Sequence, residues 1–304
     1  MTSTSKKEIS PLSLEHQEYL ESLWGQLCLK EDIRFAEYSF ANNFLFRKRH
    51  GYAVVNTTPP FLVSTNPSPG GLINSYFIPT CSPKYFTKEL LTVFKEVIAP
   101  SSTIHLFPIP EQWLPLLEQN LQSIYSCRGQ TDYIFGVEKI ETLKGRSLSS
   151  RRNLLHQLEG EHRLESRELT KETKQDAIAV LERWQKESSV PKEENDYYPC
   201  LEALELMDRL KLSGRIAYAD GEPIGFTIGE MLTPQTSLLH IAKPLHSVKG
   251  AAVFLYQDFA SHLPDSVEWI NFEQDLGIPS LRQAKSAYDP DLLLTKWHVK
   301  IRVD

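Results

Sequence analysis

Residues 269–288 constrain the fold of this chain more than any other stretch. They begin with a short apolar run typical of a buried strand and end with a polar stretch typical of a helix. Two carboxylates, Glu273 and Asp275, lie where the strand stops, and two cations, Arg282 and Lys285, follow on the helix. Carboxylates beside cations can move protons and hold an anion, so we expect a functional site at this strand end.

The composition limits the class of protein. The chain has 304 residues, of which 41% are hydrophobic and 24% charged, as in soluble proteins with one large or two ordinary domains. No apolar run can cross a bilayer and no signal sequence opens the chain, so we expect a cytoplasmic protein. The net charge of −6 means that only a local basic patch would attract nucleic acid. The cysteines and histidines are not spaced as metal ligands, so no metal is expected.

The order of predicted elements is clearest in the second half. Apolar periodicity predicts two helices, a hairpin turning at Asp220-Gly221, a strand, a helix, a strand, a helix and a closing strand. The last six of these elements are placed at residues 215–230, 237–242, 251–262, 267–272, 279–286 and 293–301. The first half repeats this order more loosely. This order is that of the GNAT (acyl-CoA N-acyltransferase-like) fold, so we predict an α/β (α+β) chain with mixed sheets flanked by helices.

Three segments carry a resemblance to a known family: residues 38–47 (YSFANNFLFR), residues 142–146 (TLKGR) with 151–153 (RRN), and residues 271–285 (NFEQDLGIPSLRQAK). The chain resembles the C-terminal domain of phosphatidylglycerol lysyltransferases and its relatives without a membrane domain, an architecture shared with Fem-type aminoacyltransferases. The resemblance implies tandem GNAT-like domains, at residues 1–137 and 138–304. It also implies acyl or aminoacyl transfer without a bound cofactor, with aminoacyl-tRNA or acyl-CoA as donor.

The carboxylates have two interpretations. Alternation from Ile270 places Asn271, Glu273 and Asp275 on one face if the strand continues that far, and a carboxylate there can take a proton from an attacking group. Alternatively, the carboxylates pair with neighbouring cations or backbone amides. We favour a catalytic role for at least one of them.

The following helix carries further candidates. Arg282 and Lys285 share a face and can clamp a phosphate, whereas Tyr288 can protonate a leaving group. The alternative is a salt-bridged surface helix with a packed tyrosine at its end.

A second candidate for binding the donor lies at residues 247–252. GNAT enzymes hold the CoA pyrophosphate at such a helix start, and Ser247, Lys249, Gly250 and Ala252 match that motif in part. An ordinary helix start with a small residue for packing explains the pattern equally well.

A basic run precedes the second half and is our candidate for binding substrate or a polyanion such as tRNA. It comprises Lys144, Arg146, Arg151, Arg152 and Asn153. Charge runs of this kind are also common on solvated surfaces.

We therefore predict a bacterial-type acyltransferase or aminoacyltransferase acting on an amine or hydroxyl of a small molecule or lipid headgroup. The alternative is a non-catalytic GNAT-fold module that binds a phosphate-bearing ligand.

Overall fold

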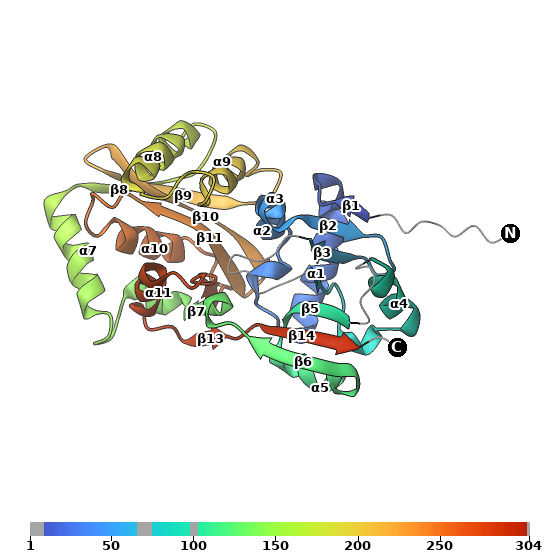
Figure 1. Cartoon of the computed structure of the whole chain (residues 1–304). Coiled ribbons are helices and arrows are strands. Elements are labelled where there is room, and N and C mark those ends of the chain that lie inside the picture. The colour runs from blue at the N-terminus through green and yellow to red at the C-terminus, as the bar shows by residue number, and fades with distance from the viewer. Residues whose placement is uncertain (1–8, 66–74, 98–102, 303–304) are drawn as a thin grey trace. The chain divides into compact units, whose positions relative to one another are not determined.

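The computed structural model describes residues 9–65, 75–97 and 103–302 and divides the chain into two compact units (Figure 1). Unit 1 consists of residues 1–131 and 295–304, and unit 2 consists of residues 132–294. The last residues of the chain, 295–304, therefore belong to the first unit. The expected division placed them in the C-terminal domain, with residues 138–304.

Unit 1 is built on a mixed sheet with the strand order β1-β2-β3-β4-β5-β14-β6. The strands are β1 (Ile9–Pro11), β2 (Tyr52–Val55), β3 (Phe61–Ser64), β4 (Tyr76–Ile78), β5 (Thr103–Ile109), β6 (Leu121–Ser126) and β14 (Trp297–Arg302). The α-helices are α1 (Gln17–Glu31), α2 (Phe40–Leu45), α3 (Arg47–His50), α4 (Lys88–Val97) and α5 (Leu114–Leu117). Short 3-10 turns lie at η1 (Leu14–His16), η2 (Ala36–Tyr38), η3 (Pro83–Tyr85), η4 (Glu111–Trp113), η5 (Glu118–Asn120) and η6 (Arg128–Gln130).

The core of unit 1 is aromatic. Phe94 of α4 packs against Phe61 and Phe77 of the sheet, with ring centroids 4.3 and 4.4 Å apart. The buried face of this helix includes the side chains of Leu90, Val93 and Phe94.

Unit 2 holds a second mixed sheet, with the order β13-β7-β12-β11-β10-β9-β8. Its strands are β7 (Asp132–Gly136), β8 (Leu164–Glu168), β9 (Ser213–Ala219), β10 (Glu222–Thr233), β11 (Thr236–Pro244), β12 (Trp269–Asn271) and β13 (Leu292–Leu294). Its helices are α6 (Val137–Thr142), α7 (Ser149–Glu161), α8 (Lys174–Glu187), α9 (Tyr197–Glu205), α10 (Ala251–Ser261) and α11 (Pro279–Ser286).

Helices cover both faces of this second sheet (Figure 1). Ala217 and Ala219 of β9 pack with Leu255 of α10 on one face, whereas the Tyr218 hydroxyl donates to Asp176 of α8 on the other. The predicted hairpin between β9 and β10 is confirmed. Its turn residues Asp220 and Gly221 have φ values of 52° and 88°, the left-handed pair that a mirror-image tight turn requires.

The predicted closing strand, residues 293–301, was wrong as a single element. It is two strands in different sheets, β13 beside β7 and β14 between β5 and β6. Lys296 lies between them with its ammonium 2.6 Å from Oε2 of Glu37, and both side chains are buried in unit 1. Local alternation predicts extended backbone, but it does not reveal which sheet will pair with it.

Among the helices formed by residues 9–65, 75–97 and 103–302, none is long and apolar enough to traverse a bilayer.

Candidate active site in the second unit

The sheet of unit 2 separates at the candidate site. Parallel pairing between β11 and β12 ends at Leu238 and Asn271, whereas β11 continues to Pro244. Just beyond that point β11 contains a bulge, because Ile241 pairs with Ile228 while Leu239 pairs with Gly229, which leaves His240 between the two registers. Bulges of this kind redirect a side chain and are common beside active sites.

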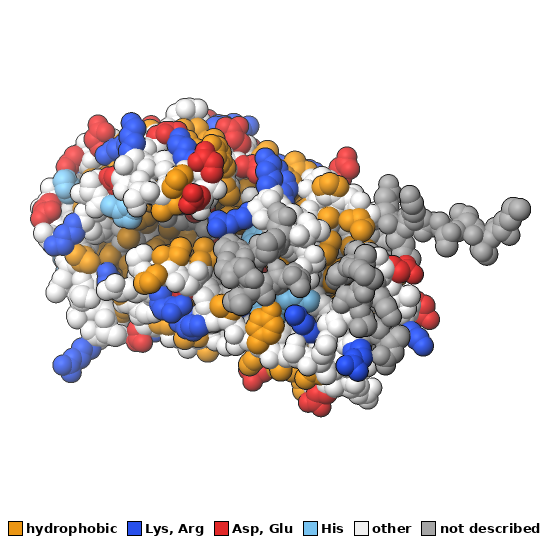
Figure 2. Space-filling model, in the orientation of Figure 1, with side chains coloured by type: hydrophobic (Ala, Val, Ile, Leu, Met, Phe, Trp, Pro, Cys, Tyr) orange, Lys and Arg blue, Asp and Glu red, His pale blue; other side chains and the backbone are white. Residues whose placement is uncertain are grey.

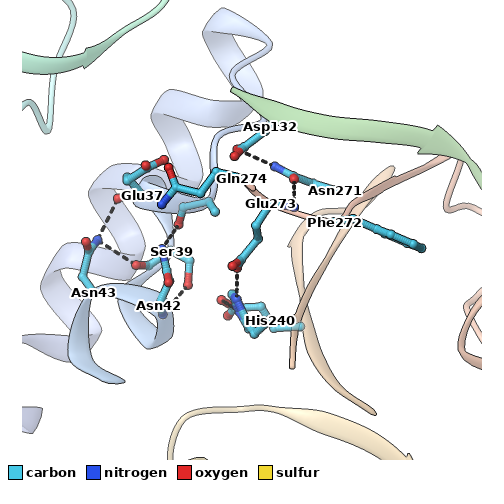
Figure 3. Close-up of polar contacts among 12 residues, drawn as sticks. Glu37, Ser39, Asn42, Asn43, Asp132, His240, Asn271, Phe272, Glu273 and Gln274 are labelled. Carbon is cyan, nitrogen blue, oxygen red and sulfur yellow. Dashed lines mark hydrogen bonds and ion pairs between the residues drawn. The ribbon is translucent and has the colours of Figure 1, made fainter. Parts of the chain in front are cut away.

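His240 lies between two carboxylates. Its Nδ1 is 2.6 Å from Oε1 of Glu273, and its Nε2 is 2.8 Å from Oε1 of Glu230. The His240 side chain is 1% exposed, against 14% for Glu230 and 17% for Glu273. Figure 3 shows Glu273 and His240 pointing toward each other.

The electrostatics of this triad follow from its hydrogen bonds. Ionised carboxylates only accept hydrogen bonds, so both ring nitrogens of His240 carry protons. Burial lowers the pKa of His240, but hydrogen bonds to Glu230 and Glu273 outweigh it and raise the pKa to about 10. His240 is therefore an imidazolium at neutral pH, held between the side chains of Glu230 and Glu273.

The backbone of Glu273 is held from both sides. Its N–H donates to Oδ1 of Asn271 at 2.6 Å, and its carbonyl accepts from the Tyr133 amide at 3.2 Å. Its φ of 61° is in the left-handed region, which is uncommon for a residue with a side chain and often marks a functional position. Among the described residues, Oε2 of Glu273 has no hydrogen-bond partner, so one oxygen remains for a ligand.

The structure separates the three residues that alternation had placed on one face. β12 ends at Asn271, so the strand does not persist to Glu273 and Asp275, and the assumption behind that prediction was wrong. Asn271 donates through Nδ2 to Asp132 at 2.9 Å, and Glu273 contacts His240 (Figure 3). Asp275 contacts Arg282 instead.

Asp275 and Arg282 form a fork-to-fork ion pair. The guanidinium donates Nε to Oδ2 at 2.8 Å and Nη2 to Oδ1 at 3.0 Å, and the Tyr133 hydroxyl adds a bond of 2.7 Å to Oδ2. Burial raises the pKa of Asp275, but the bonds from Arg282, Tyr133 and the Gly277 amide outweigh it and lower the pKa to about 2. A fully buried carboxylate held in this way anchors the loop before α11. This geometry favours the structural interpretation of the pair.

Lys285 and Tyr288 also serve the local structure. The Lys285 ammonium donates to the carbonyls of Phe272 and Gln274, at 2.6 Å each. Tyr288 is 3% exposed and packs among Phe135, Tyr256 and Phe272, and burial raises its pKa well above the usual range.

The basic run begins in the loop between α6 and α7, with Lys144 and Arg146, and continues into the start of α7. Arg152 donates to the carbonyls of Leu143 and, at 2.7 Å, Gly145, so it stabilises the loop itself. Lys144 pairs with Glu138 at 3.5 Å, and the Arg151 guanidinium lies 5.5 Å from the Tyr288 ring centroid. Arg146 and Asn153 are exposed. The run is therefore only partly available to a polyanion.

The candidate donor loop lies at the start of α10. Ser247 and Lys249 are exposed, and Gly250 has a φ of 92°. The Ser247 hydroxyl donates to Glu187 at 2.6 Å. Figure 2 shows a hollow with apolar walls on this face of unit 2, between the parts of the chain that form α8 and α10.

In unit 1, the polar residues of the segment 38–47 satisfy backbone groups. Nδ2 of Asn43 donates to the carbonyls of Glu37 and Ser39, at 2.7 and 2.8 Å, and the Ser39 hydroxyl accepts from the Asn42 amide (Figure 3). Because its polar side chains form these hydrogen bonds with the backbone, we assign the segment a structural role.

The family model for phosphatidylglycerol lysyltransferase, C-terminal, matches residues 32–300. The chain belongs to this family. No curated protein matches its sequence. Within the described residues no group of three or more histidine, cysteine or acidic side chains is arranged to hold a metal ion.

Several solved structures share the fold of this family member. A conserved protein of unknown function from Bacteroides thetaiotaomicron is 20% identical, with a TM-score of 0.81 over 97% of this chain and 100% of that one. L-PGS from Bacillus licheniformis is 12% identical, with a TM-score of 0.63 over 97% and 93%. FemX is 9% identical, with a TM-score of 0.56 over 97% and 98%. The fold is thus shared with L-PGS and FemX, and the predicted mixed sheets flanked by helices are confirmed. Family and fold support a transferase of the acyl or aminoacyl kind, without specifying donor or acceptor.

Neither His240 nor Glu230 is among the residues predicted for the site. One signal was present. Both residues lie on strands of one hairpin, since Thr233 pairs with Thr236 at its turn. In a regular hairpin with this turn, residues 230 and 240 lie close together on neighbouring strands. The bulge that orients the His240 side chain depends on tertiary structure and cannot be predicted from the turn.

Proposed function

We propose that this protein transfers an acyl or aminoacyl group from an activated ester to an amine or hydroxyl, and that Glu273 is the carboxylate that meets the acceptor. The observation that carries the proposal is the buried His240 between Glu230 and Glu273, where β11 and β12 separate. This arrangement fixes Glu273 Oε1 and leaves Oε2 without a hydrogen-bond partner among the described residues. Membership of the lysyltransferase family supports the reaction class.

The roles follow from the geometry. An acceptor amine or hydroxyl donates a hydrogen bond to Oε2 of Glu273 and attacks the acyl carbon. The new bond to that carbon forms as the bond to the leaving oxygen or sulfur breaks. Glu273 takes the acceptor's proton and passes it through water to the leaving atom, which returns Glu273 to its starting state. His240 is a positioning residue, because it acts through Glu273. Asn271 holds the Glu273 amide, and Asp275, Arg282 and Lys285 hold the loop.

Tyr288 is proposed as a packing residue, since its hydroxyl lies in the apolar core rather than at a solvent-accessible position. The donors considered are aminoacyl-tRNA and acyl-CoA, and the acceptors are small molecules or lipid headgroups. Arg146 and Arg151, with Lys144 and Asn153, remain the proposed contacts for tRNA.

The test is a trapping assay. The protein is incubated with hydroxylamine and either a pool of aminoacyl-tRNAs or acetyl-CoA, and hydroxamate formation is measured above the enzyme-free rate. We expect wild type and E159Q, an exposed control on α7, to form hydroxamate from one donor, and E273Q to form at least about 100-fold less. No hydroxamate from any donor with wild type would favour the non-catalytic binding module instead.

A further inference from the structure

The turn that precedes α10 (Ala251–Ser261) already holds an anion supplied by the chain. Glu187 is the last residue of α8, and its Oε2 accepts the His246 amide at 2.6 Å while its Oε1 accepts the Ser247 hydroxyl at 2.6 Å. Burial raises the pKa of Glu187, but the hydrogen bonds from Ser247 and His246 outweigh it, so the pKa is lowered and the group is ionised at neutral pH. A carboxylate thus occupies donors that would otherwise face a phosphate.

Helix α7 packs against the same turn. A Cβ added to Gly250 would lie 2.8 Å from the Leu154 carbonyl oxygen and 3.2 Å from Cβ of Leu158. The glycine therefore permits close approach of α7 as well as a positive φ of 92°. On the side of Gly250 where a Cβ would lie, the space is filled by α7.

The neighbouring amides are engaged within the turn. The Val248 amide donates to the Leu245 carbonyl at 3.2 Å, and the Ala251 amide to the Val248 carbonyl at 3.2 Å. The Val253 amide donates to the Gly250 carbonyl at 3.0 Å. These bonds, together with Glu187, use part of the groups that commonly hold a pyrophosphate at a helix start, and the amides of Lys249, Gly250 and Ala252 are not among those used.

We infer that Glu187 is a specificity-determining residue that excludes donors carrying a diphosphate, the acyl-CoA class, from the start of α10. The activated group then comes from a donor whose phosphates bind elsewhere on the protein. This inference rests on the proposed function, because it concerns the donor of the transfer reaction. Its test measures ligand binding and does not require turnover.

The test is titration calorimetry with CoA and with inorganic pyrophosphate. E187A removes the anion, E187Q keeps its shape and one acceptor oxygen without the charge, and E205A makes the same charge change at an exposed position on α9. We expect no binding by wild type or E205A near about 1 mM ligand, and at least about tenfold tighter pyrophosphate binding by E187A, with a smaller gain for E187Q.

Two results would overturn the inference. One is binding of CoA or pyrophosphate by wild type as tight as that of E187A. The other is the absence of any gain in both variants, which would mean that Glu187 does not decide the exclusion. E187Q preserves the size of the side chain, so its pyrophosphate binding tests the inference even if E187A does not fold. Thermal unfolding of each variant shows which of them are folded. Failure of the transfer assay would leave these binding results unchanged.

Discussion

Nδ1 of His240 lies 2.6 Å from Oε1 of Glu273, whereas the neighbouring carboxylate, Asp275, is bound by Arg282 on both oxygens. Two acidic residues two positions apart therefore have different surroundings. Glu273 keeps one oxygen without a partner among the described residues, and Asp275 is fully enclosed. We assign them different roles, and the predictions below separate these roles.

The first prediction concerns Asp275. D275N leaves Arg282 without its charge partner, and breaking a buried pair costs several kcal/mol. Since the Arg282 side chain is 40% exposed, its hydration offsets part of this cost. We expect a loss of about 2 kcal/mol in the free energy of unfolding. Urea denaturation measures it, with D265N at an exposed position as a control expected to stay within about 0.5 kcal/mol of wild type. Equal effects of the two substitutions would contradict a structural role for Asp275.

The second prediction concerns pH and His240. The pKa in the folded protein is about 10, above the ordinary value of about 6.5, so the triad's contribution is full below pH 6.5 and is lost as pH rises toward 10. The difference in unfolding free energy between wild type and H240Q should shrink across this range, by up to about 1.4 kcal/mol per pH unit. Denaturation curves at pH 6, 8 and 10 test it, and a difference that does not change with pH would refute the ion pair.

The third prediction concerns a histidine of unit 1, whose effect on stability should change with pH in the opposite direction. His298 stacks between Phe107 and Tyr125, with centroids 3.9 and 4.7 Å away, and its Nδ1 is 3.1 Å from Nε2 of His105. Burial, with the charges of His105, Lys300 and Lys296, lowers the pKa of His298 to about 3. Protonation therefore favours the unfolded chain, and its stability contribution is present above pH 6.5 and lost as pH falls toward 3.

H298F keeps an aromatic ring in the stack and removes the titrating group. We expect wild type to lose stability relative to H298F between pH 6.5 and 4, with a slope of up to about 1.4 kcal/mol per unit. Thermal unfolding of both proteins at several pH values measures this, and parallel curves would show that His298 is not buried in its neutral form.

The fourth prediction concerns two glycines with positive φ. Gly221 and Gly250 have φ values of 88° and 92°, but an added Cβ would meet nothing within 4 Å at Gly221 and the Leu154 carbonyl at Gly250. G221A should cost about 1 kcal/mol from backbone strain alone, and G250A should cost at least about 1 kcal/mol more, because α7 must also move. Equal losses in urea denaturation would mean that α7 does not close the start of α10.

The sequence predicted much of unit 2 because its signals are local. The turn residues Asp220 and Gly221 gave the hairpin, and residues 279–286 match α11 as observed. The roles of the carboxylates depended on contacts distant in sequence. Glu273 meets His240, 33 residues away, through a bulge, and Asp275 meets Tyr133, 142 residues away. Local periodicity carries no information on these partners, for the same reason that it could not assign β14 to the first sheet.

The most direct test of the central claim is the single-turnover transfer rate of E273Q at saturating donor, under conditions where urea denaturation shows wild type and variant equally folded. A carboxylate that takes the acceptor's proton is worth about 100-fold to 10,000-fold in rate. We predict a rate at least about 100-fold below wild type, with donor binding unchanged. A rate within about threefold of wild type, in a comparison that can resolve the predicted 100-fold loss, would contradict the assignment of Glu273 to the reaction.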